Sequence, residues 1–280
     1  MRNAAGWNGG AWLPVLMMAL VSLGSAAEAF DRTHPVLDGL LHRYVESGSV
    51  DYAGLVAQTH TLETYLRSLE AVSPGELAGW PRHDQLAFWI NAYNAFVLMS
   101  VVEHYPLARH TLVGLAFPAN SIWQVSGVWK NPRWRVAGRS VSLDTLEHEI
   151  IRPGFREPRI HFALVCAARS CPNLRSEAYR GDRLDLQLED QARQFFANPT
   201  KGLWLDWEKN RAVVSKIFDW YGVDFASEPA GAHRNDIERS ILRFAANRAP
   251  DAVSSAFLLR ETTHLGYLPY DWTLNDRAGR

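Results

Sequence analysis

The sequence predicts an α+β protein in which one central buried helix packs with other helices on a small, largely antiparallel sheet. Apolar residues recur at helical spacing in several segments, and short β-branched or alternating runs stand beside turn signals. These helices and strands follow one another in irregular order, without the repeated βαβ units of a doubly wound sheet. We expect a single domain over residues 30–280, because no linker, repeat or low-complexity segment interrupts them.

The first 29 residues are predicted to be a signal peptide. Arg2 gives a positive start, residues 11–21 form a short apolar core, and Ala27-Glu28-Ala29 offers small residues where a signal peptidase cleaves. This apolar run is too short to favour a membrane span, and no second such run follows it. We therefore expect cleavage near Ala29 and a periplasmic or secreted protein with no membrane span after signal removal.

Composition excludes several classes of protein. The net charge of −1 argues against a nucleic-acid partner, which would require a basic face. Two cysteines are too few for a disulfide-rich scaffold or a four-ligand structural zinc site. Because no phosphate-binding loop, dinucleotide fingerprint or metal-ligand spacing occurs, we expect no metal and no cofactor. No pattern in the sequence indicates an oligomeric state.

Each predicted element has a local signal. Residues 34–46 and 62–69 are amphipathic helices, whereas residues 84–103 are apolar on almost every side and predict the buried central helix. The β-branched and aromatic run 160–166 is the strongest strand signal. The other expected elements are hairpins over 133–141 and 204–214, and helices over 143–151, 172–179, 184–196, 216–221 and 236–247.

The cysteine-containing segment carries the clearest chemical signal. Proline is favoured at the first position of a helix, so Cys171-Pro172 places Cys171 at the N-cap of the helix expected over 172–179. There the sulfur would face unpaired backbone N–H groups, with Arg169 and Ser170 beside it to bind or orient a substrate. This setting lowers a thiol pKa, so Cys171 is the candidate nucleophile, and the same N–H groups would stabilise an oxyanion.

The candidate proton acceptors are histidines. His161 begins the expected strand and is the first candidate for a general base, with His148 as an alternative and Glu147 beside it. Asn91 and Asn94 lie on one face of the central helix. The ordinary role of two buried amides is to bind backbone groups of neighbouring loops, and the alternative is that one orients His161 or lines a substrate pocket.

The cysteine pair also allows two other functions. Cys166 and Cys171 are five residues apart, so a turn that brings their Cα atoms within about 7 Å would permit a disulfide. A permanent disulfide would fit a non-enzymatic binding domain with an aromatic surface. A bond that is readily reduced would fit a thiol–disulfide redox protein.

A series of motifs resembles the domain of unknown function 547 (DUF547) family. They occur in one order over nearly all of residues 30–280: VDYAGL (50–55), DQLAFWINAYNAF (84–96), EHYP (103–106), SLDTLEHEIIR (142–152), PRIHFALVCAARSCPNLRSEAY (158–179), SKIFDWYGVDF (215–225) and YDWTLN (270–275). The family pattern has a cysteine pair with a Cys-Pro step, which this chain has at Cys166 and Cys171. The resemblance implies family membership and names no activity.

The combination of cysteine, histidine and buried amide is similar to thiol hydrolases of the papain and transglutaminase type. Here His161 precedes Cys171, the reverse of the papain order, so a distant likeness to those enzymes would require a permuted or unrelated fold. We expect a cysteine-dependent hydrolase or acyl or amide transferase. Its substrate would be a small peptide or peptide-like molecule with a peptide, γ-glutamyl or cell-wall peptide amide bond.

Overall fold

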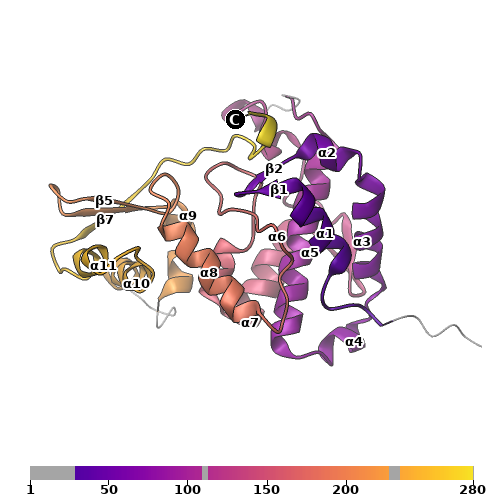
Figure 1. The fold of residues 1–280 in the computed structure, drawn as a ribbon, viewed down its shortest axis with the longest axis horizontal. Coiled ribbons are helices and arrows are strands. Elements are labelled where there is room, and N and C mark those ends of the chain that lie inside the picture. Colours follow the sequence, from indigo (N-terminus) through magenta and orange to yellow (C-terminus); the bar gives the residue numbers. More distant parts are fainter. Residues whose placement is uncertain (1–28, 109–112, 227–233, 280) are drawn as a thin grey trace, which may run out of the picture.

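The computed structural model describes residues 29–108, 113–226 and 234–279 (Figure 1). The predicted signal peptide lies outside these residues except for Ala29. Helices and small, largely antiparallel sheets make up the described chain, which confirms the α+β class. Two adjoining hydrophobic cores organise these elements.

The first core surrounds the central helix α5. The helices of this part of the chain are α1 (Pro35–Tyr44), α2 (Tyr52–Val56), α3 (Thr59–Ala71), α4 (Pro74–Ala78) and α5 (Arg82–Val102). In the described part of the chain, α5 is the one helix long and apolar enough to cross a membrane. Its apolar window is 94% buried inside the protein, and α2 and α3 pack against it (Figure 1). The predicted buried central helix is therefore confirmed.

Two short hairpins accompany the first core. Strands β1 (Val45–Glu46) and β2 (Ser49–Val50) form one, and β3 (Trp134–Val136) and β4 (Arg139–Val141) form the other. The second hairpin turns at Ala137 and Gly138, with φ of 47° and 72°. Positive φ at both central residues is the two-residue turn whose twist matches that of the paired strands, so the predicted hairpin is confirmed.

The second core contains aliphatic side chains packed around five buried phenylalanine rings, Phe162, Phe195, Phe196, Phe218 and Phe225. The elements around it are α8 (Leu184–Phe196), β5 (Leu203–Asp206), β6 (Arg211–Val214), α9 (Ile217–Tyr221), η5 (Gly222–Phe225), α10 (Arg234–Ala246), α11 (Ala252–Leu258) and β7 (His264–Tyr267). Strand β6 pairs antiparallel with β5 and parallel with β7. Figure 1 shows this sheet, α10 and α11 on the side of the molecule away from α1–α4.

A π-helical segment interrupts one helix of the first core, to which its buried residues Leu146 and Ile151 belong. The predicted helix over 143–151 begins as α6 (Leu143–Thr145), with Ser142 accepting a hydrogen bond from the backbone N–H of Thr145. It continues as the π-helix η3 (Leu146–Ile151) and ends as α7 (Arg152–Phe155). Single π-helical turns inside helices are rare and are frequent at functional sites.

The predicted strand over 160–166 is wrong. Pro158–Phe162 is the short 3₁₀ helix η4, and the residues after it run as a loop over α5. The backbone N–H of Val165 donates to the Asn94 side chain (3.1 Å) instead of to a neighbouring strand. A short apolar run is consistent with any buried segment, so periodicity does not distinguish a strand from this loop.

The predicted helix over 172–179 is also wrong, because these residues are irregular. Side chains of other elements accept their backbone hydrogen bonds. The N–H of Ala178 donates to Asp38 (2.8 Å), and the N–H of Tyr179 donates to Asn91 (3.0 Å). Once these distant acceptors are available, the backbone does not need helical partners. Cys171 is therefore not a helix N-cap.

Candidate active site

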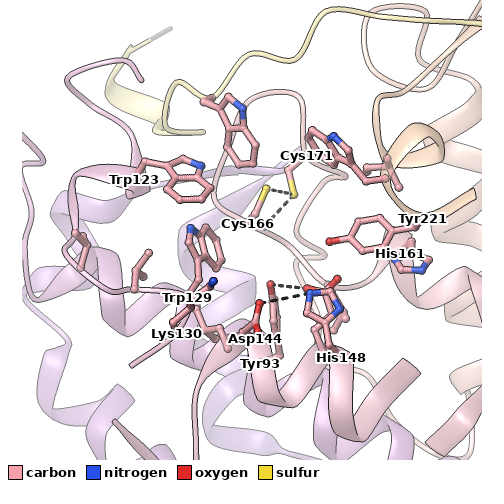
Figure 2. Close-up of a pocket in the computed structure, with 18 of the residues that line it drawn as sticks. Tyr93, Trp123, Trp129, Lys130, Asp144, His148, His161, Cys166, Cys171 and Tyr221 are labelled. Carbon is pink, nitrogen blue, oxygen red and sulfur yellow. Dashed lines mark hydrogen bonds and ion pairs between the residues drawn. The ribbon is translucent and has the colours of Figure 1, made fainter. Parts of the chain in front are cut away.

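A cavity of about 590 Å³ contains both cysteines in its wall (Figure 2). Its wall is largely aromatic, formed by Tyr93, Trp123, Trp129, Trp220, Tyr221, Tyr270 and Trp272. Its polar side chains include Lys130, Asp144, Glu147, His148 and His161. Cavities of this size, apolar with a few convergent polar groups, are typical of small-molecule and peptide sites.

The two thiols lie against each other. The Cys166 thiol donates to Cys171 Sγ at 2.8 Å, and the Cys166 backbone N–H donates to the same sulfur at 2.9 Å. The Tyr270 hydroxyl oxygen lies 3.2 Å from Cys166 Sγ. Ala167, with φ of 58°, turns the chain back between the cysteines. Both cysteines are free thiols in this structure.

Distant segments hold the cysteine loop in place. The Asn94 amide donates to the carbonyl of Ala163 (2.9 Å), and a segment near residue 274 binds the other side of the loop. There Arg169 N–H donates to the Thr273 carbonyl (2.8 Å), and Asn275 N–H donates to the Ala167 carbonyl. The loop is thus fixed by side chains and by the C-terminal part of the chain, not by regular secondary structure.

This environment gives the two thiols different pKa values. Burial by itself raises a thiol pKa, but hydrogen bonds from the Cys166 thiol and backbone N–H, with a contribution from Tyr270, lower the pKa of Cys171. The positive charge of Lys201 acts in the same direction. The pKa of Cys166 is raised well above its usual value by burial and by its role as hydrogen-bond donor to Cys171. Cys171 is therefore the thiol that becomes the thiolate, which is the nucleophilic form.

His161 forms a pair with an aspartate that the sequence analysis did not identify. Its Nε2 lies 2.7 Å from Asp224 Oδ2, and its ring stacks on Tyr221 with centroids 4.3 Å apart. Arg152 donates two hydrogen bonds to the same carboxylate, at 2.7 and 2.9 Å. Partial burial by itself raises the pKa of Asp224, but the partners His161 and Arg152 lower it far below the usual range. Asp224 lies in the motif SKIFDWYGVDF (215–225), and this motif was the sequence signal that could have identified it.

No hydrogen bond joins a histidine to either sulfur in the ranges that the structure describes. In the view of Figure 2, the Tyr221 ring lies between His161 and the cysteine pair. Catalytic hydrogen bonds are often long or poorly aligned before a substrate binds, so His161 is still a candidate general base. It lies in the cavity wall, with its side chain 2% exposed.

Residues 77–196 match the family model described as "Protein of unknown function, DUF547". This part of the chain belongs to the DUF547 family. Comparison with curated proteins and with solved structures gave no significant match. The DUF547 match contains Cys166, Cys171, His161 and α5, whereas Asp224 and Tyr270 lie beyond it.

The π-helix of the DUF547 region places Glu147 and His148 in the cavity. Glu147 accepts hydrogen bonds from the hydroxyl of Tyr93 (3.2 Å) and from that of Tyr221. His148 Nδ1 lies 2.8 Å from Arg152 Nη1, and its Nε2 lies 3.6 Å from Asp144 Oδ1. Figure 2 shows Asp144 and His148 on the side of the cavity opposite the cysteines.

Four other predicted site residues lie outside the cavity wall. The Asn91 amide donates to the Tyr179 carbonyl (2.7 Å), so both asparagines of α5 bind loop backbone, the ordinary role expected for them. Arg169 and Ser170 line a separate polar cavity of about 440 Å³, where Ser170 Oγ accepts from the Asp271 N–H. Within the described ranges, no three histidine, cysteine or acidic side chains are grouped as metal ligands.

Proposed function

We propose that this protein is a thiol-dependent hydrolase or acyl or amide transferase with Cys171 as its nucleophile. The observation that carries the proposal is a thiol of lowered pKa in the wall of an aromatic cavity that is also lined by His161, whose ring is bound by Asp224. Thiolate, histidine and orienting carboxylate are the parts of a cysteine-based acyl-transfer site. Here the orienting group is Asp224, in place of the amides considered from the sequence.

The proposed reaction has two stages. His161 takes the proton of the Cys171 thiol, Cys171 Sγ attacks a carbonyl carbon and forms a C–S bond, and the C–N or C–O bond breaks as His161 gives that proton to the leaving amine or alcohol. The thioester is then attacked by water in a hydrolase, or by an amine in a transferase; His161 takes the proton of the attacking group, the C–S bond breaks, and Cys171 is released as the thiolate. Asp224 holds the His161 ring through Nε2, which leaves Nδ1 to exchange the proton.

The cavity suits a peptide-like substrate. Its aromatic wall would pack against apolar side chains, and its size fits a few residues of peptide. Lys130, Asp144 and Glu147 in the wall provide both signs of charge for the polar ends of such a molecule. We therefore propose peptide, γ-glutamyl or cell-wall peptide amides as the substrates. The proposed location, periplasmic or secreted, rests on the predicted signal peptide.

The test uses two reagents under non-reducing conditions, on protein that has been reduced beforehand and freed of the reductant. Iodoacetamide alkylates a thiolate, and p-nitrophenyl acetate acylates it and releases a coloured product. We expect both adducts on Cys171 in the unaltered protein, their loss in Cys171→Ala, and their retention in the matched control Cys166→Ala. Adducts that persist in Cys171→Ala, or that occur only on Cys166, would contradict the assignment.

A second candidate is thiol–disulfide exchange, which the 2.8 Å separation of the two sulfurs favours. In this reaction Cys171 attacks a substrate disulfide, Cys166 then displaces the mixed disulfide, and the pair leaves oxidised while the substrate is reduced. Mass measurement of alkylated protein across a glutathione redox series discriminates the candidates. A pair that resists mild reductant would instead favour a binding domain.

A further inference from the structure

The oxyanion donors expected from the sequence are not present. They were to be backbone N–H groups of a helix beginning at Pro172, and residues 172–179 form no helix. An acyl-transfer site nevertheless requires hydrogen-bond donors aimed at the oxygen on which negative charge develops. This inference rests on the proposed function and concerns which group supplies that donor.

Three tyrosine hydroxyls line the cavity, and they differ in their partners. Tyr93 and Tyr221 both donate to Glu147, so that carboxylate already accepts their hydroxyl protons. The Tyr270 hydroxyl instead contacts the cysteine pair, 3.2 Å from Cys166 Sγ, and it stabilises the Cys171 thiolate. It is the tyrosine hydroxyl of the cavity wall that lies against the reacting sulfur pair.

The ring of Tyr270 is firmly held. It packs on Trp220 and Trp272, with centroid distances of 4.8 and 4.6 Å. The backbone N–H of the next residue, Asp271, donates to Ser170 Oγ, which directly precedes Cys171 in the chain. The hydroxyl is thus fixed relative to the nucleophile by contacts on both sides, as a preorganised donor must be.

We propose that Tyr270 is a catalytic residue whose hydroxyl donates a hydrogen bond to the oxyanion formed when Cys171 attacks a carbonyl. In this step a C–S bond forms and the carbonyl π electrons move to oxygen, which accepts the Tyr270 hydrogen bond. The oxyanion then collapses, the C–N or C–O bond breaks, and the thioester remains on Cys171. Tyr270 keeps its proton throughout. Burial and the nearby cysteines raise its pKa well above the usual value, so it stays a donor.

The experiment compares two reactions of the same thiolate. Alkylation by iodoacetamide forms no oxyanion, whereas acylation by p-nitrophenyl acetate does. Both rates are measured against pH for unaltered protein and Tyr270→Phe, and are compared on the plateau where Cys171 is fully ionised. In the variant we expect plateau alkylation within about 2-fold of the unaltered rate and acylation lowered about 100-fold, as for loss of one oxyanion donor. The alkylation profile should also shift to higher pH, because a donor to the thiolate is lost.

Tyr179→Phe is the matched control. Its hydroxyl is buried without a hydrogen-bond partner and lies outside the cavity wall, so both plateau rates should be unchanged. Equal losses in alkylation and acylation, or acylation that is unchanged in Tyr270→Phe, would overturn the role of Tyr270 while leaving Cys171 as nucleophile. Absence of any acyl adduct on Cys171 in the unaltered protein would overturn the proposed function itself, and with it this role.

Discussion

The two hydrophobic cores are built in different ways. The first core, around α5, contains two buried asparagines that hydrogen-bond the backbone of irregular segments. The second core packs phenylalanine rings with aliphatic side chains, and most of these residues belong to regular helices and strands. Amide side chains can replace secondary structure as partners for loop backbone, whereas aromatic rings cannot. The irregular loop that contains the candidate nucleophile is therefore held on one side by an amide of the first core.

The candidate site lies where the two cores meet. The cysteines belong to the first core, and Phe162, the residue after His161, belongs to the second. Arg152 and Asp224 join the two sides through paired hydrogen bonds. Perturbing one core at a time should therefore show which of them the site depends on.

The largest effect is expected from Phe162→Ala in the second core. Phe162 is fully buried and contacts the rings of Phe195, Phe196 and Phe218. Removing a buried phenylalanine ring leaves a cavity and lowers the free energy of unfolding by about 3–5 kcal/mol. Urea unfolding measures this loss, and a change below about 1 kcal/mol would show that packing of these rings does not stabilise the second core.

A comparable loss is expected from Asn94→Ala in the first core. The substitution leaves the Ala163 carbonyl and the Val165 N–H buried without their partner. At about 1–2 kcal/mol for each group, the free energy of unfolding should fall by on the order of 3 kcal/mol. The adjacent cysteine loop should also loosen, so amide exchange of Val165 should accelerate. Unchanged exchange at Val165 would mean that Asn94 does not hold the loop.

The contrast between the cores explains what the sequence could predict. The apolar run of α5 and the turn at Ala137-Gly138 have local causes, so their structures are correctly predicted. The loop after His161 and the irregular segment at 172–179 depend on side chains such as Asn94 and Asn91, which are far away in the sequence. Local patterns do not encode such partners.

The residues of the candidate site were likewise predictable only in part. The cavity contains Cys171, His161, His148 and Glu147, all of which the residue types alone indicated. The partner of His161 is Asp224, 63 positions away, and no local spacing connects them. The oxyanion donor expected from a helix start is wrong for the same reason: the helix was inferred from Pro172, and tertiary hydrogen bonds override that preference.

Protonation of His34, in the first core, should lower the free energy of unfolding as the pH falls. The side chain is 2% exposed, and burial lowers its pKa from 6.5 to about 4. The unfolded chain therefore binds more protons between these values, so stability is complete above pH 6.5 and falls as the pH drops toward 4. At 1.36 kcal/mol per pKa unit, the loss is about 3 kcal/mol. His34→Asn should flatten this part of the curve, and an unaltered slope would exclude His34 as its cause.

The smallest change in stability is expected from Asp224→Asn, at the junction of the cores. The pKa of Asp224 is lowered on folding, so its contribution is present above the usual aspartate value of about 3.9 and is lost as the pH falls. At pH 7 the free energy of unfolding should fall by about 1–2 kcal/mol, and the two proteins should converge in acid. Acylation of Cys171 should slow far more than this loss implies, because His161 loses its orienting charge. Equal acylation rates would remove Asp224 from the site.

The environment of the candidate nucleophile depends on the last part of the chain. Tyr270 lies 104 positions after Cys166, and Leu274 pairs with Ala168 inside the cysteine loop. Under the proposed function, the contacts that lower the pKa of Cys171 are therefore complete only when this late segment has folded onto the loop. A chain shortened before residue 270 would contain both cysteines and lack these contacts.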